Sequence, residues 1–155
     1  MALDTGQSSN ARDTVNIVEV SPRDGLQNEA GFVATADKLA LIGQLVGMGA
    51  RRVEVASFVN PRRVPQMADA EEVVAGLPAA PGVRFIGLCL NERGVARAIA
   101  TQANARPLDE AGCVLVASDS FGIINQGQSV ADGIVANSAM LKLARDAGLY
   151  AQVTI

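Results

Sequence analysis

The sequence predicts an α/β fold built on a parallel sheet. Short runs dominated by apolar residues recur along the chain, as is typical of strands that are buried on both faces. Segments with apolar residues at helical spacing separate these runs, and the runs start roughly 30 residues apart, which is the size of one strand–helix unit. This alternation predicts parallel strands that are joined by helical crossovers.

Five runs are expected to form the strands: 16–20 (NIVEV), 52–56 (RVEVA), 84–90 (RFIGLCL), 113–117 (CVLVA) and 150–155 (YAQVTI). Four helices are expected between them, at 35–48, 67–77, 91–105 and 129–147. The tail at 1–14 is polar and is expected to be disordered, which leaves 15–155 as the folded domain.

Local signals mark the ends of these helices. Thr35 is a plausible N-cap for the first helix, and Gly49 is a plausible stop. Asn91 can cap the third helix, and Ser129 followed by Asp132 resembles a capping box that opens the fourth. An open doubly wound sheet and part of a TIM barrel both fit this order of elements, and periodicity does not separate them.

Composition excludes several classes of protein. The net charge is −3 and only 3% of residues are aromatic, so neither a basic patch nor a stacking platform for nucleic acid is expected. No apolar stretch approaches the ~20 residues of a membrane span, and the N-terminus lacks a secretory apolar region. Cys89 and Cys113 lie in apolar runs and are interpreted as reduced core residues. A cytoplasmic enzyme is the default expectation.

The stretch after the first predicted strand is the main candidate for chemistry. Arg23 and Asp24 would lie at the carboxyl end of that strand, where active sites of parallel sheets lie. A carboxylate there can hold a hard cation such as Mg²⁺, and a guanidinium can neutralise a developing enolate. A surface turn is the alternative, because Pro22 and Gly25 are ordinary turn residues. The chain contains no G-x-G-x-x-G motif, which removes the main support for a dinucleotide-binding fold.

Two carboxylates lie inside predicted strands. Glu54 is flanked by Val53 and Val55, so alternation puts it on the opposite face of its strand. In a barrel that face could be the interior, where a carboxylate needs a cation, and Arg23 is the natural partner. An outward-facing residue on an edge strand is the alternative for Glu54 and equally for Glu19.

Two further loops carry polar groups. Arg62 and Arg63 could attract an anionic substrate, although a solvated basic turn explains them equally well. The stretch 118–126 starts with Ser118 and reads as a polar loop with one apolar anchor, Phe121. Such a loop is compatible with a substrate pocket.

Three segments together resemble a known family. The stretch 18–29 (VEVSPRDGLQNE) closely resembles the opening motif of 3-hydroxy-3-methylglutaryl-CoA lyases. The stretches 53–59 (VEVASFV) and 64–69 (VPQMAD) resemble that family's second-strand region, and Ser118, Phe121 and Asn125 fit its fourth loop more loosely. The resemblance runs from about Val15 to Ile155. Homocitrate-, isopropylmalate- and citramalate-synthase-like enzymes and some aldolases share the Arg–Asp–Glu part of the pattern, but the continuation 26–29 (LQNE) favours the lyase.

The resemblance implies a TIM (β/α)8 barrel, of which this chain would carry the first five strands and four helices. It implies a Mg²⁺- or Mn²⁺-dependent cleavage of 3-hydroxy-3-methylglutaryl-CoA to acetoacetate and acetyl-CoA. By position, Asp24 would be a metal ligand and Arg23 would stabilise the enolate. Glu54 would support Arg23, while Gln27 and Ser118 would contact the acyl-CoA substrate. The complete enzyme is expected to be a homo-oligomer, as a dimer.

The chain departs from the family pattern in two ways. The family takes further metal ligands from a His-x-His pair and uses a cysteine in a glycine-rich loop, whereas this sequence has no histidine, and neither of its cysteines has such surroundings. A related synthase or aldolase therefore stays open as an alternative. So does a non-catalytic half-barrel, if the chain ends at Ile155.

Overall fold

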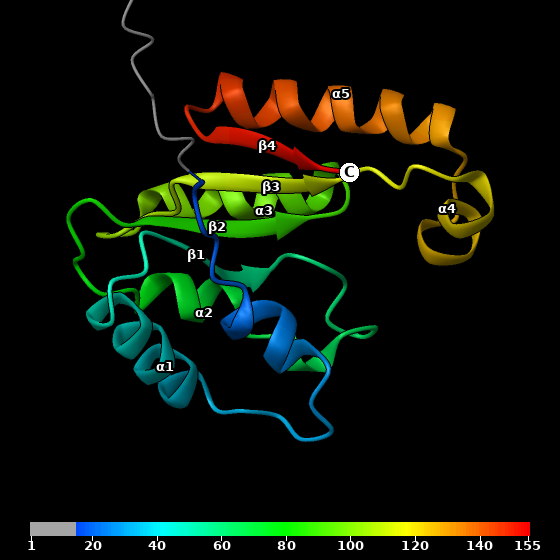
Figure 1. Ribbon diagram of the computed structural model, residues 1–155. Coiled ribbons are helices and arrows are strands. Elements are labelled where there is room, and N and C mark those ends of the chain that lie inside the picture. The colour runs from blue at the N-terminus through cyan, green and yellow to red at the C-terminus, as the bar shows by residue number, and fades with distance from the viewer. Residues whose placement is uncertain (1–14) are drawn as a thin grey trace, which may run out of the picture.

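The fold is organised around one parallel sheet. The computed structural model describes residues 15–155, so the tail expected at 1–14 lies outside the described residues. The strands are β1 (Arg52–Ser57), β2 (Arg84–Cys89), β3 (Glu110–Val114) and β4 (Tyr150–Thr154). All neighbours pair in parallel in the order β1-β2-β3-β4, and their arrows point the same way in Figure 1. The predicted parallel α/β fold is confirmed.

The prediction of a full first strand at 16–20 is wrong for the described residues. Only Glu19 pairs with the sheet, through an isolated bridge to Val53. The Glu19 N–H donates to the Arg52 carbonyl at 2.9 Å, and the Glu54 N–H donates to the Glu19 carbonyl at 2.8 Å. The physical reason is that the chain coils into a helical turn at Ser21, so only this one residue runs alongside β1.

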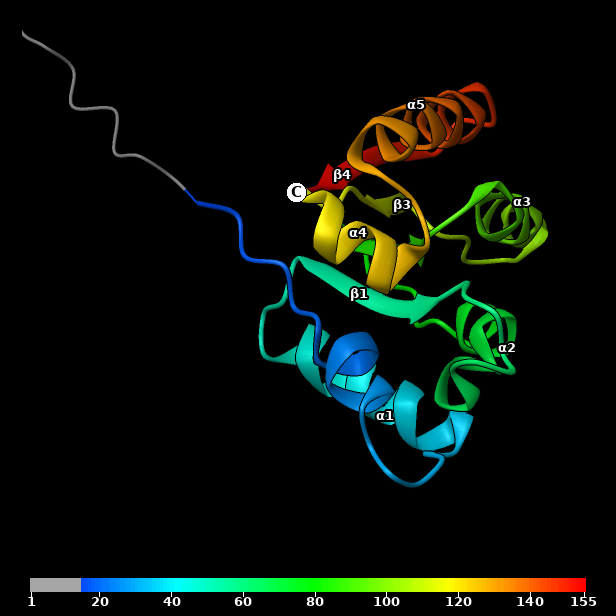
Figure 2. The ribbon, with the colours of Figure 1, turned by 90° about the vertical axis from the view of Figure 1, so that its right-hand side faces the viewer.

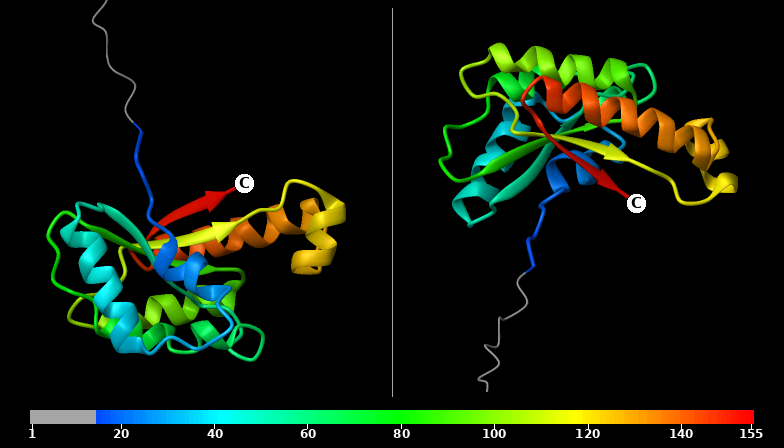
Figure 3. Two further views of the ribbon diagram at one scale, coloured as in Figure 1. Left: turned by 60° about the horizontal axis from the view of Figure 1, so that its bottom comes forward. Right: turned by 90° about the horizontal axis from the view of Figure 1, so that it is seen from above.

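Most of the helices pack against one face of the sheet, and α4 lies beyond its carboxyl end (Figure 2 and Figure 3). The helices are α1 (Thr35–Gly47), α2 (Ala70–Ala75), α3 (Glu92–Ala100), α4 (Asp119–Gln126) and α5 (Val130–Asp146), with helical turns η1 (Ser21–Gly25), η2 (Pro65–Met67) and η3 (Thr101–Ala103). Figure 2 shows α1, α2, α3 and α5 in an arc around the sheet. None of the helices in residues 15–155 is long and apolar enough to cross a membrane.

Helix α4 corrects the expected polar loop at 118–126. The segment forms a helix that ends at Gly127, which has a φ of 73°. Phe121 is not an anchor, because 56% of it is exposed. In both views of Figure 3 this helix stands beyond the tip of β3, at the carboxyl end of the sheet.

Most of the predicted caps are confirmed. The Asn91 side chain accepts from the Gly94 N–H, and the Ser129 side chain accepts from the Asp132 N–H. Gly49, with a φ of 103°, follows α1 as expected. Thr35 is the exception, because Ala34 occupies the N-cap position.

The two faces of the sheet differ in chemistry. Val53, Phe85 and Ala111 point toward the helices and belong to one hydrophobic core. Residues paired in register on parallel strands share a face, so Glu54 and Ile86 lie together on the opposite face, and Glu110 extends the row. This opposite face therefore carries charged side chains as well as apolar ones.

Candidate functional site

Arg23 is held between two carboxylates at the carboxyl end of β1. Its Nε donates to the Glu54 carboxylate, and its Nη1 donates to Asp24 Oδ1 at 2.6 Å. The side chains of Arg23 and Glu54 are 14% and 10% exposed, whereas that of Asp24 is 54% exposed. The predicted Arg23–Glu54 pair is therefore present and largely shielded from water, and Asp24 faces outward.

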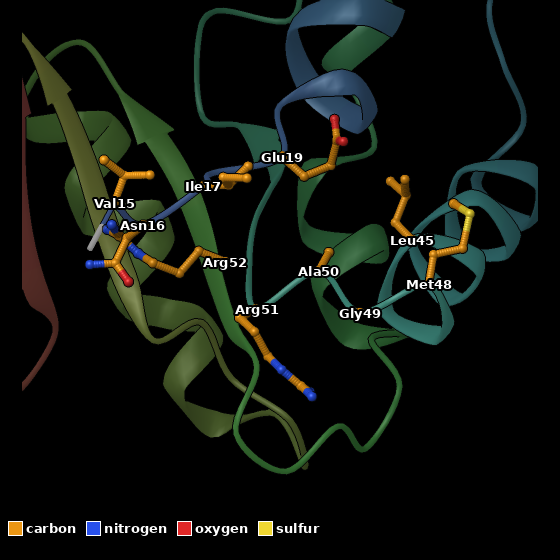
Figure 4. A pocket seen from close by; sticks show the side chains of 10 residues that line it. All are labelled: Val15, Asn16, Ile17, Glu19, Leu45, Met48, Gly49, Ala50, Arg51 and Arg52. Atoms are coloured by element: carbon orange, nitrogen blue, oxygen red, sulfur yellow. The ribbon is translucent and has the colours of Figure 1, made fainter. Parts of the chain in front are cut away.

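Glu19 supports the turn that carries this arginine. Its carboxylate accepts the Ser21 N–H at 2.8 Å, and this hydrogen bond lowers the pKa of Glu19. Figure 4 shows the side chain pointing away from Arg51 and Arg52, toward the coil that contains η1. Glu19 thus holds η1 with its side chain while its main chain pairs with β1.

A cavity of about 540 Å³ opens at the carboxyl ends of the strands. Six carboxamide side chains line it, namely Gln27, Asn60, Asn91, Asn125, Gln126 and Gln128. Four aliphatic side chains and one guanidinium, that of Arg63, complete the wall. The Gln27 Oε1 atom is buried and accepts no hydrogen bond from the described residues. Gln27 therefore brings a buried acceptor without a partner to the wall of this cavity.

Ser118 stands apart from the other predicted site residues. It is exposed at the N-cap of α4, where its side chain makes no capping hydrogen bond, and it is not part of the cavity wall. Arg23 contacts both Asp24 and Glu54, and Gln27 follows Asp24 by three residues. Of these four residues, only Gln27 lines the cavity. Asn125 and Gln126 of α4 reach the cavity instead of Ser118.

A buried ion pair that sequence reasoning missed supports the loops around this cavity. Lys38 Nζ lies 2.5 Å from Asp69 Oδ1 and 2.5 Å from the Gln66 carbonyl oxygen. Thr35 donates to Asp69 Oδ2 at 2.7 Å, and Gln66 Nε2 donates to the Glu29 carbonyl at 2.7 Å. The only signal in the sequence is that Lys38 precedes the core residue Ile42 by one helical turn, which places it on the buried face.

Another hollow, of about 460 Å³, lies at the opposite end of the sheet. Figure 4 shows its wall, which combines Leu45 and Met48 of the α1 end with the start of β1. Parallel α/β sheets bind their ligands at the carboxyl ends of the strands. The cavity beside Gln27 is therefore the candidate site.

The cysteines contribute no reactive group. Cys89 and Cys113 are free, fully buried and paired in register on β2 and β3. Burial raises the pKa of both thiols, so they stay protonated at neutral pH. Their prediction as reduced core residues is confirmed.

The donors around Asp24 suit a hard cation only in part. The Asp24 carboxylate and the unpartnered Gln27 amide oxygen are oxygen ligands of the kind that Mg²⁺ and Mn²⁺ prefer. Within residues 15–155, no group of three or more His, Cys, Asp or Glu side chains is placed to hold a metal ion. Asp24 and Gln27 would therefore supply only some of the ligands of such a site.

Comparisons with known proteins identify the chain's relatives. No family model matches it. It is 37% identical to a hydroxymethylglutaryl-CoA lyase of Pseudomonas mevalonii, over 87% of this chain and 43% of that protein. It is 39% identical to the mitochondrial form of Bos taurus, over 96% and 44%, and 41% identical to a cytoplasmic form of Rattus norvegicus, over 86% and 37%. The chain thus spans less than half the length of these curated relatives.

Solved structures give the same answer for the fold. The HMG-CoA lyase of Brucella melitensis superposes with a TM-score of 0.82 at 42% identity, over 90% of this chain and 47% of that one. A lyase of Acinetobacter baumannii, solved with coenzyme A and 3-methylmalate, superposes with a TM-score of 0.79 at 33% identity, over 89% and 43%. In sequence and in fold, the chain is therefore similar to hydroxymethylglutaryl-CoA lyases over nearly all of its own length and over less than half of theirs.

Proposed function

We propose that the protein acts as a divalent-metal-dependent lyase that cleaves 3-hydroxy-3-methylglutaryl-CoA to acetoacetate and acetyl-CoA. The observation that carries this proposal is the Arg23 guanidinium, fixed by Glu54 and Asp24 at the carboxyl end of the sheet. Its support is the likeness to lyases that are 36–42% identical to this chain.

The hydrogen bonds of Arg23 suggest its role. Nε and Nη1 are occupied by carboxylates, and Nη2 donates to no atom of residues 15–155. In the proposed reaction the tertiary hydroxyl loses its proton and the adjacent carbon–carbon bond breaks. The electron pair moves onto the thioester carbonyl and gives the enolate of acetyl-CoA, which is then protonated. A guanidinium N–H that is already oriented can stabilise that enolate oxygen without reorganisation.

Asp24 would hold Mg²⁺ or Mn²⁺, with the Gln27 amide oxygen beside it. When bound, the cation would polarise the substrate oxygens and make the tertiary hydroxyl more acidic. Glu54 accepts the hydrogen bond from Arg23 Nε, so the guanidinium does not turn fully toward Asp24. The second carboxylate oxygen of Asp24 accepts no hydrogen bond from the described residues, so it would be available to the cation.

An acyl-CoA is the proposed substrate class, and the bound coenzyme A in the Acinetobacter baumannii relative supports it. A homodimeric assembly and a cytoplasmic location remain predictions, since the curated relatives include cytoplasmic and mitochondrial forms.

The test is a product assay on the purified protein. With 3-hydroxy-3-methylglutaryl-CoA and Mg²⁺ or Mn²⁺ we expect release of acetyl-CoA, and we expect EDTA to abolish it. Consumption of acetyl-CoA together with a 2-oxo acid would instead favour a related synthase. Release that persists at full rate in EDTA would contradict the metal dependence.

A further inference from the structure

The wall of the cavity beside Gln27 carries a net positive charge. Its wall contains one cation, Arg63, and no carboxylate, while six carboxamides supply neutral donors and acceptors. Within residues 15–155, five other arginines form salt bridges with carboxylates, and Arg63 forms none. An unpaired guanidinium among amide groups is complementary to an anion.

The local backbone determines which of two adjacent arginines faces this cavity. The Asn60 side-chain oxygen accepts the Arg62 N–H at 3.0 Å, and the Asn60 carbonyl accepts the Arg63 N–H at 2.9 Å. Pro61 fixes its own φ inside this turn. As a result Arg63 lines the cavity, whereas Arg62, which is also exposed, does not.

We propose that Arg63 is a ligand-binding residue that pairs with an anionic group of the molecule bound in this cavity. If the proposed function is right, that group is either the free carboxylate of the acyl part or a phosphate of coenzyme A. Both accept hydrogen bonds from a planar guanidinium in the same way. The inference depends on the proposed function only for the identity of the ligand.

The neighbouring arginine provides a matched control. Arg62→Gln and Arg63→Gln remove the same charge from adjacent positions of one exposed turn, so net charge is equal in the two variants and similar fold stability is expected. Binding of free coenzyme A and of 3-hydroxy-3-methylglutarate is measured by titration calorimetry on the full-length protein, at fixed salt concentration and with Mg²⁺. Thermal melting of each variant checks the fold.

We expect Arg63→Gln to weaken binding of one of the two probes roughly 10- to 100-fold, as for the loss of a hydrogen bond between charged groups. Arg62→Gln should bind like the wild type, and Arg63→Lys should fall between the two. Weakened binding of coenzyme A assigns Arg63 to a phosphate, and weakened binding of the free acid assigns it to the carboxylate.

The inference is wrong if Arg62→Gln and Arg63→Gln bind equally, whether both weaken or neither does, or if the wild-type protein binds neither probe. Because the titration needs no turnover, its outcome is separate from that of the product assay. Acetyl-CoA release with unchanged probe binding in Arg63→Gln would overturn this inference and leave the proposed function standing.

Discussion

At the scale of single residues, the site depends on how one guanidinium is held. Glu54 and Asp24 each take one nitrogen of Arg23, so the side chain is oriented before any ligand arrives. Glu19 fixes the start of the same turn through Ser21. The result is a closed set of contacts in which β1 carries both the bridge to Glu19 and the carboxylate that Arg23 reaches.

Replacing Arg23 tests whether this orientation serves catalysis. Arg23→Gln removes the charge and the oriented donor, and we expect turnover to fall by about 10²- to 10³-fold, the range seen when an oxyanion donor is lost. Arg23→Lys keeps the charge but not the planar set of guanidinium donors, so it should recover only part of the rate. Turnover is followed as acetyl-CoA release, and an unchanged rate in Arg23→Gln would remove this residue from the mechanism.

Glu19 should act as a positioning residue. Glu19→Ala leaves the Ser21 N–H without its acceptor, and we expect about a tenfold loss of turnover, equivalent to 1.4 kcal/mol. Glu19→Gln keeps an acceptor oxygen and should restore most of that rate. A purely structural role would instead lower the melting temperature of both variants without separating their rates.

At the scale of elements, sequence signals worked where the cause is local. The side chains of Asn91 and Ser129 cap their helices by accepting a hydrogen bond from the backbone N–H three residues onward. Such a cap depends only on neighbouring residues, so it can be predicted from the sequence. Helix α4 escaped prediction because Phe121, Ile123 and Ile124 are exposed and form no stripe facing a core.

The same reasoning explains which site contacts were predictable. The Arg23–Glu54 pair could be predicted, because a carboxylate inside a buried strand needs a cationic partner, and Arg23 follows the segment that was expected to be the neighbouring strand. The Lys38–Asp69 pair joins α1 to the loop before α2, and nothing local requires a lysine to be buried. That contact depends on how two distant segments pack.

Breaking the Lys38–Asp69 pair should be costly. The side chains of Lys38 and Asp69 are 2% and 7% exposed, so removing either charge leaves the other buried and unpaired. We expect Lys38→Met and Asp69→Asn each to lower the free energy of unfolding by about 3–5 kcal/mol. Urea denaturation measures this, and a double variant that is less destabilised than the sum would demonstrate the coupling. Independent, additive effects would argue against the pair.

The ion pair between α2 and α3 should make stability depend on pH. Its hydrogen bond to Arg97 lowers the pKa of Glu71 below 4.5, so its contribution is complete above that value and is lost as the pH falls through the lowered pKa. Because 46% of Glu71 and 30% of Arg97 are exposed, the pair contributes only about 0.5 kcal/mol. Glu71→Gln should therefore be slightly less stable than wild type at pH 7 and equal to it once the pH lies below the lowered pKa of Glu71. A difference that persists in acid would point to lost packing instead.

At the scale of the whole molecule, a polar cluster spans the face of the sheet opposite the helices. Glu110 of β3 is fully buried and contacts Arg52 of β1 and Arg84 of β2. Arg52 also donates to Gln152 of β4 at 2.7 Å, so the cluster joins all four strands. The hydrogen bond to Glu110 also raises the pKa of Arg52.

Glu110 is therefore expected to stabilise the sheet as a unit. Glu110→Gln leaves the guanidinium groups of Arg52 and Arg84 without their carboxylate, and we expect the free energy of unfolding to fall by about 3 kcal/mol, at the lower end for a buried pair because both arginines remain partly in water. Lys142→Gln removes a charge from an exposed pair with Asp146 and should change it by less than about 0.5 kcal/mol. Urea denaturation of the two variants makes the comparison. Equal stabilities would mean that the cluster is an incidental contact, and that the apolar core on the helix side holds the four strands together by itself.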